Sequence, residues 1–85
     1  MRLTQLKPGQ KAFIKRVNDK KSRGQITRFG LTFGAEIHCI KNIKKGPVII
    51  NVDNIFLAIG YRLAHEIVVG RQKNEKANYS FSWKS

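Results

Sequence analysis

Residues 29–34 read Phe29-Gly-Leu-Thr-Phe-Gly34, and this stretch decides the fold. Its two glycines, four positions apart, bracket an apolar loop between a short helical pattern and a strand pattern. Gly30 stands where a helix ends on a residue in the left-handed conformation, which glycine adopts without steric cost. Gly34 stands where a tight turn leads into a strand. The stretch therefore predicts a helix, a loop and a strand joined by two structural glycines.

A strand pattern and a short helix precede this loop. Residues 12–17 alternate in part, which is typical of a strand. Ser22 and Gln25 fit a capping box, in which a serine caps the first helical turn and a glutamine three residues later reaches back. Ile26 and Phe29, three apart, would face the core on a helix of about two turns. The cations on or beside the outer face of that helix would be Lys20, Lys21, Arg23 and Arg28.

Strand patterns dominate the chain after Gly34. In residues 36–40, Ile37 and Cys39 are expected inward, with Glu36 and His38 outward. Residues 42–46 read as a basic turn, and Pro47 can open the following strand because its missing N–H matters least there.

Two further strands, over 48–52 and 55–59, are joined by the pair Asp53-Asn54, which tolerates positive φ in a hairpin. The inward residues would be Val48, Ile50 and Val52 on the first strand and Ile55, Leu57 and Ile59 on the second. A single helical turn over 60–65 and a last strand over 66–70 complete the pattern.

This order of motifs resembles the FeoA family: Leu3, Leu6 and Gly9 in a Leu-x-x-Leu-x-x-Gly pattern, then strand, helix, the two-glycine loop, strand, Gly46-Pro47 and three short strands. The resemblance covers residues 3–69. It implies a mainly β fold, a small SH3-like barrel of about five strands with one short helix inserted after the first. We expect the barrel to be closed, since closure hides strand edges.

The loop and the hairpin each differ from the family pattern at one residue. Phe33 replaces the proline that the family commonly has before the second glycine. Its ring would either fill the end of the barrel or protrude as a partner contact. Asn54 stands where the family often has glycine, a change that turn chemistry allows.

The chain reads as one domain over residues 1–70 followed by an extension over 71–85. In the extension Tyr79, Phe81 and Trp83 alternate with polar residues, which indicates either a frayed tail or a strand that docks on the barrel, a partner or a membrane interface. The N-terminus shows no apolar run of signal-peptide length. No stretch approaches the roughly 20 apolar residues of a membrane span. We therefore expect a soluble, cytoplasmic protein.

The net charge of +12 is unevenly distributed. Residues 1–28 hold nine lysines and arginines against one acid, whereas residues 29–70 hold four against three. The extension holds four against one. Such a field attracts polyanions, including nucleic acid, anionic lipids or an acidic protein face. The alternative is a solvated surface that merely keeps a small protein in solution.

No pattern typical of an enzyme or a metal site is present. The chain lacks nucleotide-binding, metalloprotease and nucleophile-elbow motifs, and its five acids leave few pairs for proton transfer. His38 and Cys39 are adjacent, so on a strand they face opposite sides and cannot hold one ion together. His65 reads as a capping or surface residue. A single cysteine forms no intramolecular disulfide. We predict no catalysis, no metal, no cofactor and no small-molecule substrate.

The resemblance implies a small cytoplasmic accessory protein for ferrous iron uptake that binds the cytosolic part of an FeoB-like transporter and reaches the membrane through it. The predicted partner-binding residues are Lys20, Lys21, Arg23, Arg28 and Phe33, and the predicted structural turn residues are Gly30, Gly34, Gly46, Pro47 and Asn54. Weak contact with polyanions or anionic lipids is a further expectation, and the oligomeric state stays open.

Two other interpretations compete with this one. A basic small barrel that binds nucleic acid would explain the charge, although Phe13, Phe29 and Phe56 are expected to pack rather than stack on bases. The pattern also resembles the SH3-like C-terminal domain of iron-dependent repressors, without their other domains.

Overall fold

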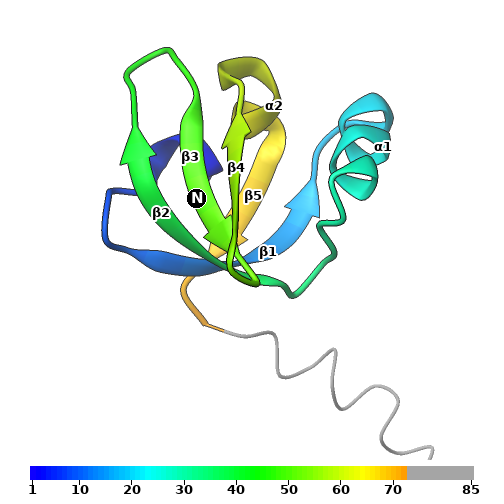
Figure 1. Ribbon diagram of the computed structural model, residues 1–85. Coiled ribbons are helices and arrows are strands. Elements are labelled where there is room, and N and C mark those ends of the chain that lie inside the picture. The colour runs from blue at the N-terminus through cyan, green and yellow to red at the C-terminus, as the bar shows by residue number, and fades with distance from the viewer. Residues whose placement is uncertain (73–85) are drawn as a thin grey trace, which may run out of the picture.

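Alternating apolar residues build a five-stranded antiparallel sheet in the computed structural model, which describes residues 1–72. The sheet order is β4-β3-β2-β1-β5 (Figure 1). The strands are β1 (Lys11–Val17), β2 (Glu36–Asn42), β3 (Val48–Val52), β4 (Ile55–Ile59) and β5 (Ile67–Gly70). The remaining elements are the 3₁₀ helix η1 (Leu3–Gln5) and the α-helices α1 (Lys20–Arg28) and α2 (Tyr61–Glu66). The predicted strands are therefore all present, with α1 inserted after the first.

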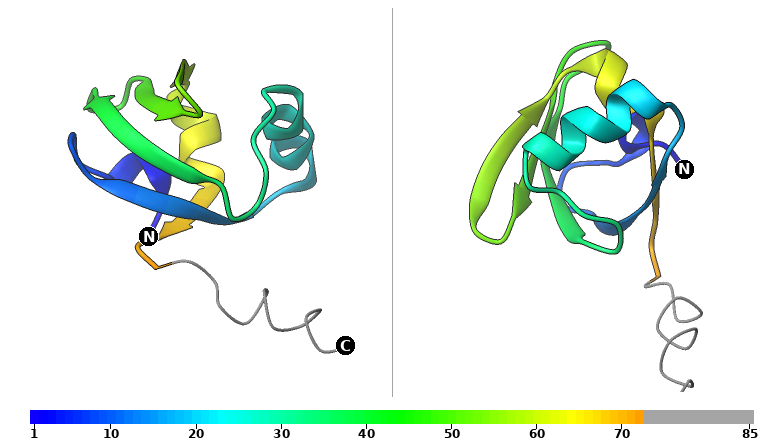
Figure 2. Two further views of the ribbon diagram at one scale, coloured as in Figure 1. Left: turned by 60° about the horizontal axis from the view of Figure 1, so that its bottom comes forward. Right: turned by 90° about the vertical axis from the view of Figure 1, so that its right-hand side faces the viewer.

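Bulges give the sheet its curvature. The pairing of β1 with β5 shifts register between Ile14 and Arg16, and that of β2 with β3 shifts between Cys39 and Lys41. An extra residue on one strand bends it and increases its twist. The sheet consequently curls around the core, with α1 at one side (Figure 2). The SH3-like arrangement is confirmed.

The prediction that the barrel is closed is wrong. Within residues 1–72, β4 and β5 form the two edges of the sheet and do not pair with each other. Ile55 lies directly opposite the buried Val52 and so on the inward face, as predicted, but it is 59% exposed; the prediction that Phe56 packs is wrong, since Phe56 is 65% exposed. The cause is position, since β4 is an edge strand, on which Ile59 is buried and Leu57 is only partly buried against the core. Because an edge strand has a neighbouring strand on one side only, the apolar pattern of residues 55–59 predicted more burial than β4 has.

The core lies on the concave side of the sheet and takes residues from nearly every element. Ile37 and Cys39 on β2 point inward as predicted, and so do Val48, Ile50 and Val52 on β3. Leu3 and Leu6, from η1 and the residue after it, are completely buried. They were predicted only as part of the Leu-x-x-Leu-x-x-Gly motif, and no helix or strand was predicted for them. The other buried apolar residues are Ala12, Ile14, Val17, Ile26, Leu31, Ile59, Ala64, Ile67 and Val69.

The N-terminal residues cover the outer edge of β5. The amino group of Met1 donates to the Val69 carbonyl at 3.1 Å, and the Val69 amide donates to the Met1 carbonyl at 2.7 Å. Arg2 forms an isolated bridge with Val68. This pairing supplies β5 with backbone partners on its second side, which closure of the barrel would otherwise have provided.

Two turns have the backbone that their sequences predict. Asp53 and Asn54 both have positive φ, at 50° and 66°, as a two-residue hairpin of type I′ requires. In the β2–β3 turn, Lys45 has a φ of 56°, and the Gly46 amide donates to the Ile43 carbonyl at 2.7 Å. A Cβ on Gly46 would lie 2.8 Å from Cγ2 of Ile43, so the turn needs a glycine there for space.

Pro47 directly precedes β3, and its carbonyl accepts from the Ile43 amide at 3.2 Å. Its missing N–H therefore costs the sheet nothing, as predicted. No helix among residues 1–72 is long and apolar enough to cross a membrane. The predictions for Tyr79, Phe81 and Trp83 fall outside the described residues.

Candidate functional site

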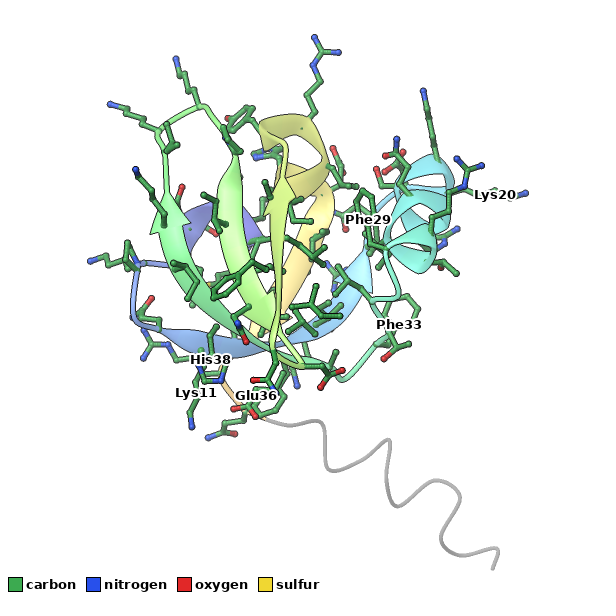
Figure 3. The ribbon with its side chains drawn as sticks, viewed as in Figure 1. Lys11, Lys20, Phe29, Phe33, Glu36 and His38 are labelled. Atoms are coloured by element: carbon green, nitrogen blue, oxygen red, sulfur yellow. The ribbon has the colours of Figure 1, made fainter. Side chains whose placement is uncertain are left out.

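Helix α1 turns one narrow face to the core and carries its cations on the others. Ser22 and Ile26, four residues apart, are the only buried residues of the helix. The four predicted partner-binding cations, Lys20, Lys21, Arg23 and Arg28, are all exposed. Figure 3 shows Lys20 pointing away from the sheet. The basic outer face that the sequence predicts is therefore present, and its role in binding remains a prediction.

The predicted capping box at Ser22 is wrong. The helix begins two residues before Ser22, with Asp19 as N-cap, and the Arg23 amide donates to the Asp19 carbonyl at 3.1 Å. Ser22 instead lies inside the helix against the core, only 7% exposed. Tertiary packing of the Ser22–Ile26 face thus outweighs the local capping preference of serine.

The end of α1 forms a Schellman motif. Gly30 has a φ of +83°, and its amide donates to the Thr27 carbonyl at 3.0 Å. The Leu31 amide reaches back to the Ile26 carbonyl at 3.1 Å, and both of these side chains are buried. The two bonds and the apolar contact are the defining features of this helix end. The left-handed conformation predicted for Gly30 is present.

A second turn carries the loop from α1 to β2. The Ala35 amide donates to the Thr32 carbonyl at 3.1 Å, and Gly34 at the third position has a φ of +87°. A turn with glycine there corresponds to type II, for which proline is the favoured second residue. Phe33 takes that second position without disturbing the turn. The Gly34 amide also donates to the Ile14 carbonyl at 2.7 Å, which fixes the loop to β1.

Two phenyl rings of this loop are exposed. Phe33 is 57% exposed, so of the two placements that the sequence allowed, the ring protrudes. Phe29, predicted to face the core, is 47% exposed, because it is the C-cap residue and the chain leaves the helix there. Figure 3 shows both rings beside the C-terminal end of α1. Exposed aromatic side chains on a fixed loop are typical anchors of protein interfaces.

A groove of about 450 Å³ separates α1 from α2. Both signs of charge line it, with Asp19 and Glu66 against Lys21 and Arg62. The other lining residues are Ser22, Gln25, Tyr61, Leu63 and His65. Of the predicted partner-binding residues only Lys21 lines this groove. The α2 residues were missed because nothing in the sequence shows that two helices more than 30 residues apart lie side by side.

The titratable residues singled out in the sequence occupy separate places. His38 is exposed on β2. Burial raises the pKa of the Cys39 thiol, and a backbone hydrogen bond to Lys41 partly opposes this rise. The thiol lies 3.7 Å from the Leu6 carbonyl, so it acts as a small core residue, as predicted. His65 contacts the Arg2 guanidinium through Nε2 and stacks on Tyr61. Among residues 1–72 no three such side chains lie close enough to hold a metal ion.

Comparison with known proteins adds the following. A family model described as FeoA domain matches residues 1–71. A crystal structure titled iron uptake regulatory protein (FeoA) has a TM-score of 0.77 and 31% identity, covering 82% of this chain and 95% of that one. The solution structure of FeoA protein from Chlorobium tepidum has a TM-score of 0.71 and 26% identity, covering 84% and 70%.

A manganese-dependent transcriptional repressor is similar in fold alone, with a TM-score of 0.76 at 15% identity. The match covers 85% of this chain and 41% of the repressor. Among curated proteins no significant match is found.

Proposed function

Because the chain belongs to the FeoA family, we propose that it is a cytoplasmic accessory protein of ferrous iron uptake that binds the cytosolic part of an FeoB-like transporter. The observation that carries the proposal is the family match over residues 1–71, together with a similar FeoA structure at 31% identity. The family match supports a part in ferrous iron transport at the level of the family. The transporter as partner and the absence of catalysis belong to the proposal.

Three features of the surface support a binding role. The cations of α1 are exposed, although the Arg23 guanidinium also donates to the Val17 carbonyl at 3.3 Å, and their charge would speed association with an acidic partner face. Phe29 and Phe33 offer apolar anchors next to them. The groove between α1 and α2 adds a concave surface with both signs of charge. We define α1 and the loop through Gly34 as the partner face.

Deleting the gene tests the proposal directly. Ferrous iron uptake should fall several-fold, while ferric uptake through other systems persists, because only the ferrous route depends on the accessory protein. The measurement is radioactive iron uptake with and without a reductant. A plasmid copy of the wild-type gene should restore uptake. Unchanged ferrous uptake in the deletion strain would show that the assignment is wrong.

Phe33→Ser tests the partner face. The variant should lose at least about fivefold in affinity for the cytosolic part of the transporter, since an exposed aromatic anchor contributes about 1–4 kcal/mol to an interface. Its stability should change little, because the ring is mostly in solvent. Binding is measured by calorimetry and stability by thermal melting.

Phe56→Ser is the matched control, since Phe56 is a similarly exposed phenylalanine on the edge strand β4. It should keep wild-type affinity. Equal losses in the two variants, or none in either, would place the contact somewhere other than the partner face.

A further inference from the structure

The end of the domain formed by the β2–β3 turn and α2 is basic and partly apolar. Lys44 and Lys45 lie in the turn, and Arg62 lies on α2 next to Tyr61. A hollow of about 250 Å³ is lined by both lysines and by Tyr61, so the turn and the helix are spatial neighbours. Figures 1 and 2 show the turn and α2 at the same end of the molecule. We call Ile43, Lys44, Lys45, Tyr61 and Arg62 the basic end.

The carboxylates of the sheet lie away from the basic end. β2 begins at Glu36 and the β3–β4 hairpin contains Asp53; both acids line one hollow at the opposite end of the sheet. Figure 3 shows Glu36 at that opposite end. The acid nearest to the basic end is Glu66 on α2, which lines the groove toward α1. The basic end therefore contains three cations and no carboxylate, whereas the opposite end holds Asp53 and Glu36, and Glu36 is paired there with Lys11 at 3.6 Å.

Two of the five residues of the basic end are apolar or amphipathic and partly exposed. Ile43 is 42% exposed and Tyr61 is 38% exposed. The Ile43 amide and carbonyl both bond within the turn, to Pro47 and Gly46, so the side chain is presented on a fixed backbone. A tyrosine and an aliphatic residue among lysines and arginine match the composition of surfaces that lie at a membrane interface.

We propose that the basic end docks on the anionic phospholipid surface of a membrane, with Lys44, Lys45 and Arg62 on the headgroups and Ile43 and Tyr61 at the acyl boundary. Nucleic acid would favour a set of exposed rings for stacking on bases. Among residues 1–72 the exposed phenylalanines lie on the α1 loop and on β4, and the basic end contributes one tyrosine, packed on His65. An aliphatic side chain flanked by lysines fits lipid better than bases.

This contact goes beyond the proposed function, because it needs no transporter. It is also compatible with it: α1 lies at a side of the sheet, whereas the β2–β3 turn lies at an end (Figure 1). The partner face as defined shares no residue with the basic end, although Tyr61 and Arg62 also line the groove between α1 and α2. Membrane docking would hold the protein beside a membrane-embedded partner.

The test is flotation of the full chain with vesicles of phosphatidylcholine containing phosphatidylserine, compared with vesicles of phosphatidylcholine alone. Each cation near an anionic surface contributes about a fivefold factor in binding. The variant Lys44→Gln, Lys45→Gln, Arg62→Gln should therefore bind anionic vesicles about 100-fold more weakly. Neither protein should bind the neutral vesicles. Circular dichroism melting checks that the variants are folded.

The matched control removes three charges from α1 instead, at cations that do not line the groove with Arg62: Lys20→Gln, Arg23→Gln, Arg28→Gln. It should lose less than about threefold, since long-range attraction beyond a Debye length of about 8 Å is screened at physiological salt. The variant Ile43→Ser keeps every charge and should still bind anionic vesicles more weakly than the wild type, because it lacks the apolar contact at the acyl boundary. Equal losses in the two triple variants, or no vesicle binding by the wild type, would overturn the proposal.

Binding of the same proteins to single-stranded RNA tests the alternative that the basic end binds nucleic acid. Tight RNA binding that the basic-end variant abolishes, combined with absent vesicle binding, would assign this end to nucleic acid and overturn the lipid proposal. RNA binding that falls equally in the two triple variants, beside vesicle binding that falls only in the basic-end variant, supports the proposal, because such RNA binding reflects net charge alone.

Discussion

Leu6→Ala should lower the free energy of unfolding by about 2–5 kcal/mol, the cost of a cavity at a fully buried leucine. Leu6 has no exposed surface and lies in the core beside β2. Its carbonyl accepts from Nδ2 of Asn42 at 2.7 Å, so a side chain and a backbone group together attach the N-terminal segment to the sheet. A domain of this size has about 5–15 kcal/mol in total, so the loss is a large share.

Urea unfolding followed by circular dichroism measures this loss. The control is Lys7→Ala, at the neighbouring exposed position, which should change stability by less than about 0.5 kcal/mol. A loss below about 1 kcal/mol for Leu6→Ala would mean that the segment before β1 contributes little to the fold.

Gly30→Val should cost about 1–3 kcal/mol, because a β-branched residue is forced into the left-handed conformation. A Cβ at Gly30 would meet nothing within 4 Å, so the expected cost comes from the backbone alone and not from a clash. Urea unfolding measures the stability of this variant and of a comparison variant, Gly24→Ala. Gly24 lies in the middle of α1, and a Cβ there also meets nothing within 4 Å.

Gly24→Ala should stabilise the protein by about 0.5–1 kcal/mol, since alanine has a higher helix propensity than glycine. The two glycines lie six residues apart and should respond with opposite signs. Unchanged stability of Gly30→Val would contradict the assignment of Gly30 as the left-handed residue that ends the helix, and a loss in Gly24→Ala would contradict an unstrained helical position for Gly24.

Local patterns predicted local structure well. The two-glycine loop, the Asp53-Asn54 hairpin and the alternation in β2 and β3 each depend on residues within a few positions of one another. Their conformations are set by steric limits on φ and by which face of a strand is apolar, and both can be read from neighbouring residues.

Errors arose where tertiary position decides burial. Ile55 and Phe56 fit a buried strand, yet β4 is an edge and exposes them. Ser22 fits the pattern of a helix N-cap, yet it lies inside α1, where it packs against the core. The groove between α1 and α2 depends on the relative placement of two helices, which no local pattern encodes. Of the candidate site, the exposed cations were predictable and the placement of the Phe33 ring was left between two alternatives, whereas Tyr61, Arg62 and Glu66 were not predicted.

The pairing of Met1 with Val69 constrains when the protein can fold during its synthesis. The first residue bonds to a residue 68 positions later, and β1 needs β5 to complete one of its two sides. A ribosome that has made only the first four strands has produced a chain in which β1 is an exposed edge and Leu3 and Leu6 lack part of their cover. Contacts of such long sequence separation form late and slowly. The nascent chain therefore stays open to chaperones and to other strands until β5 has emerged.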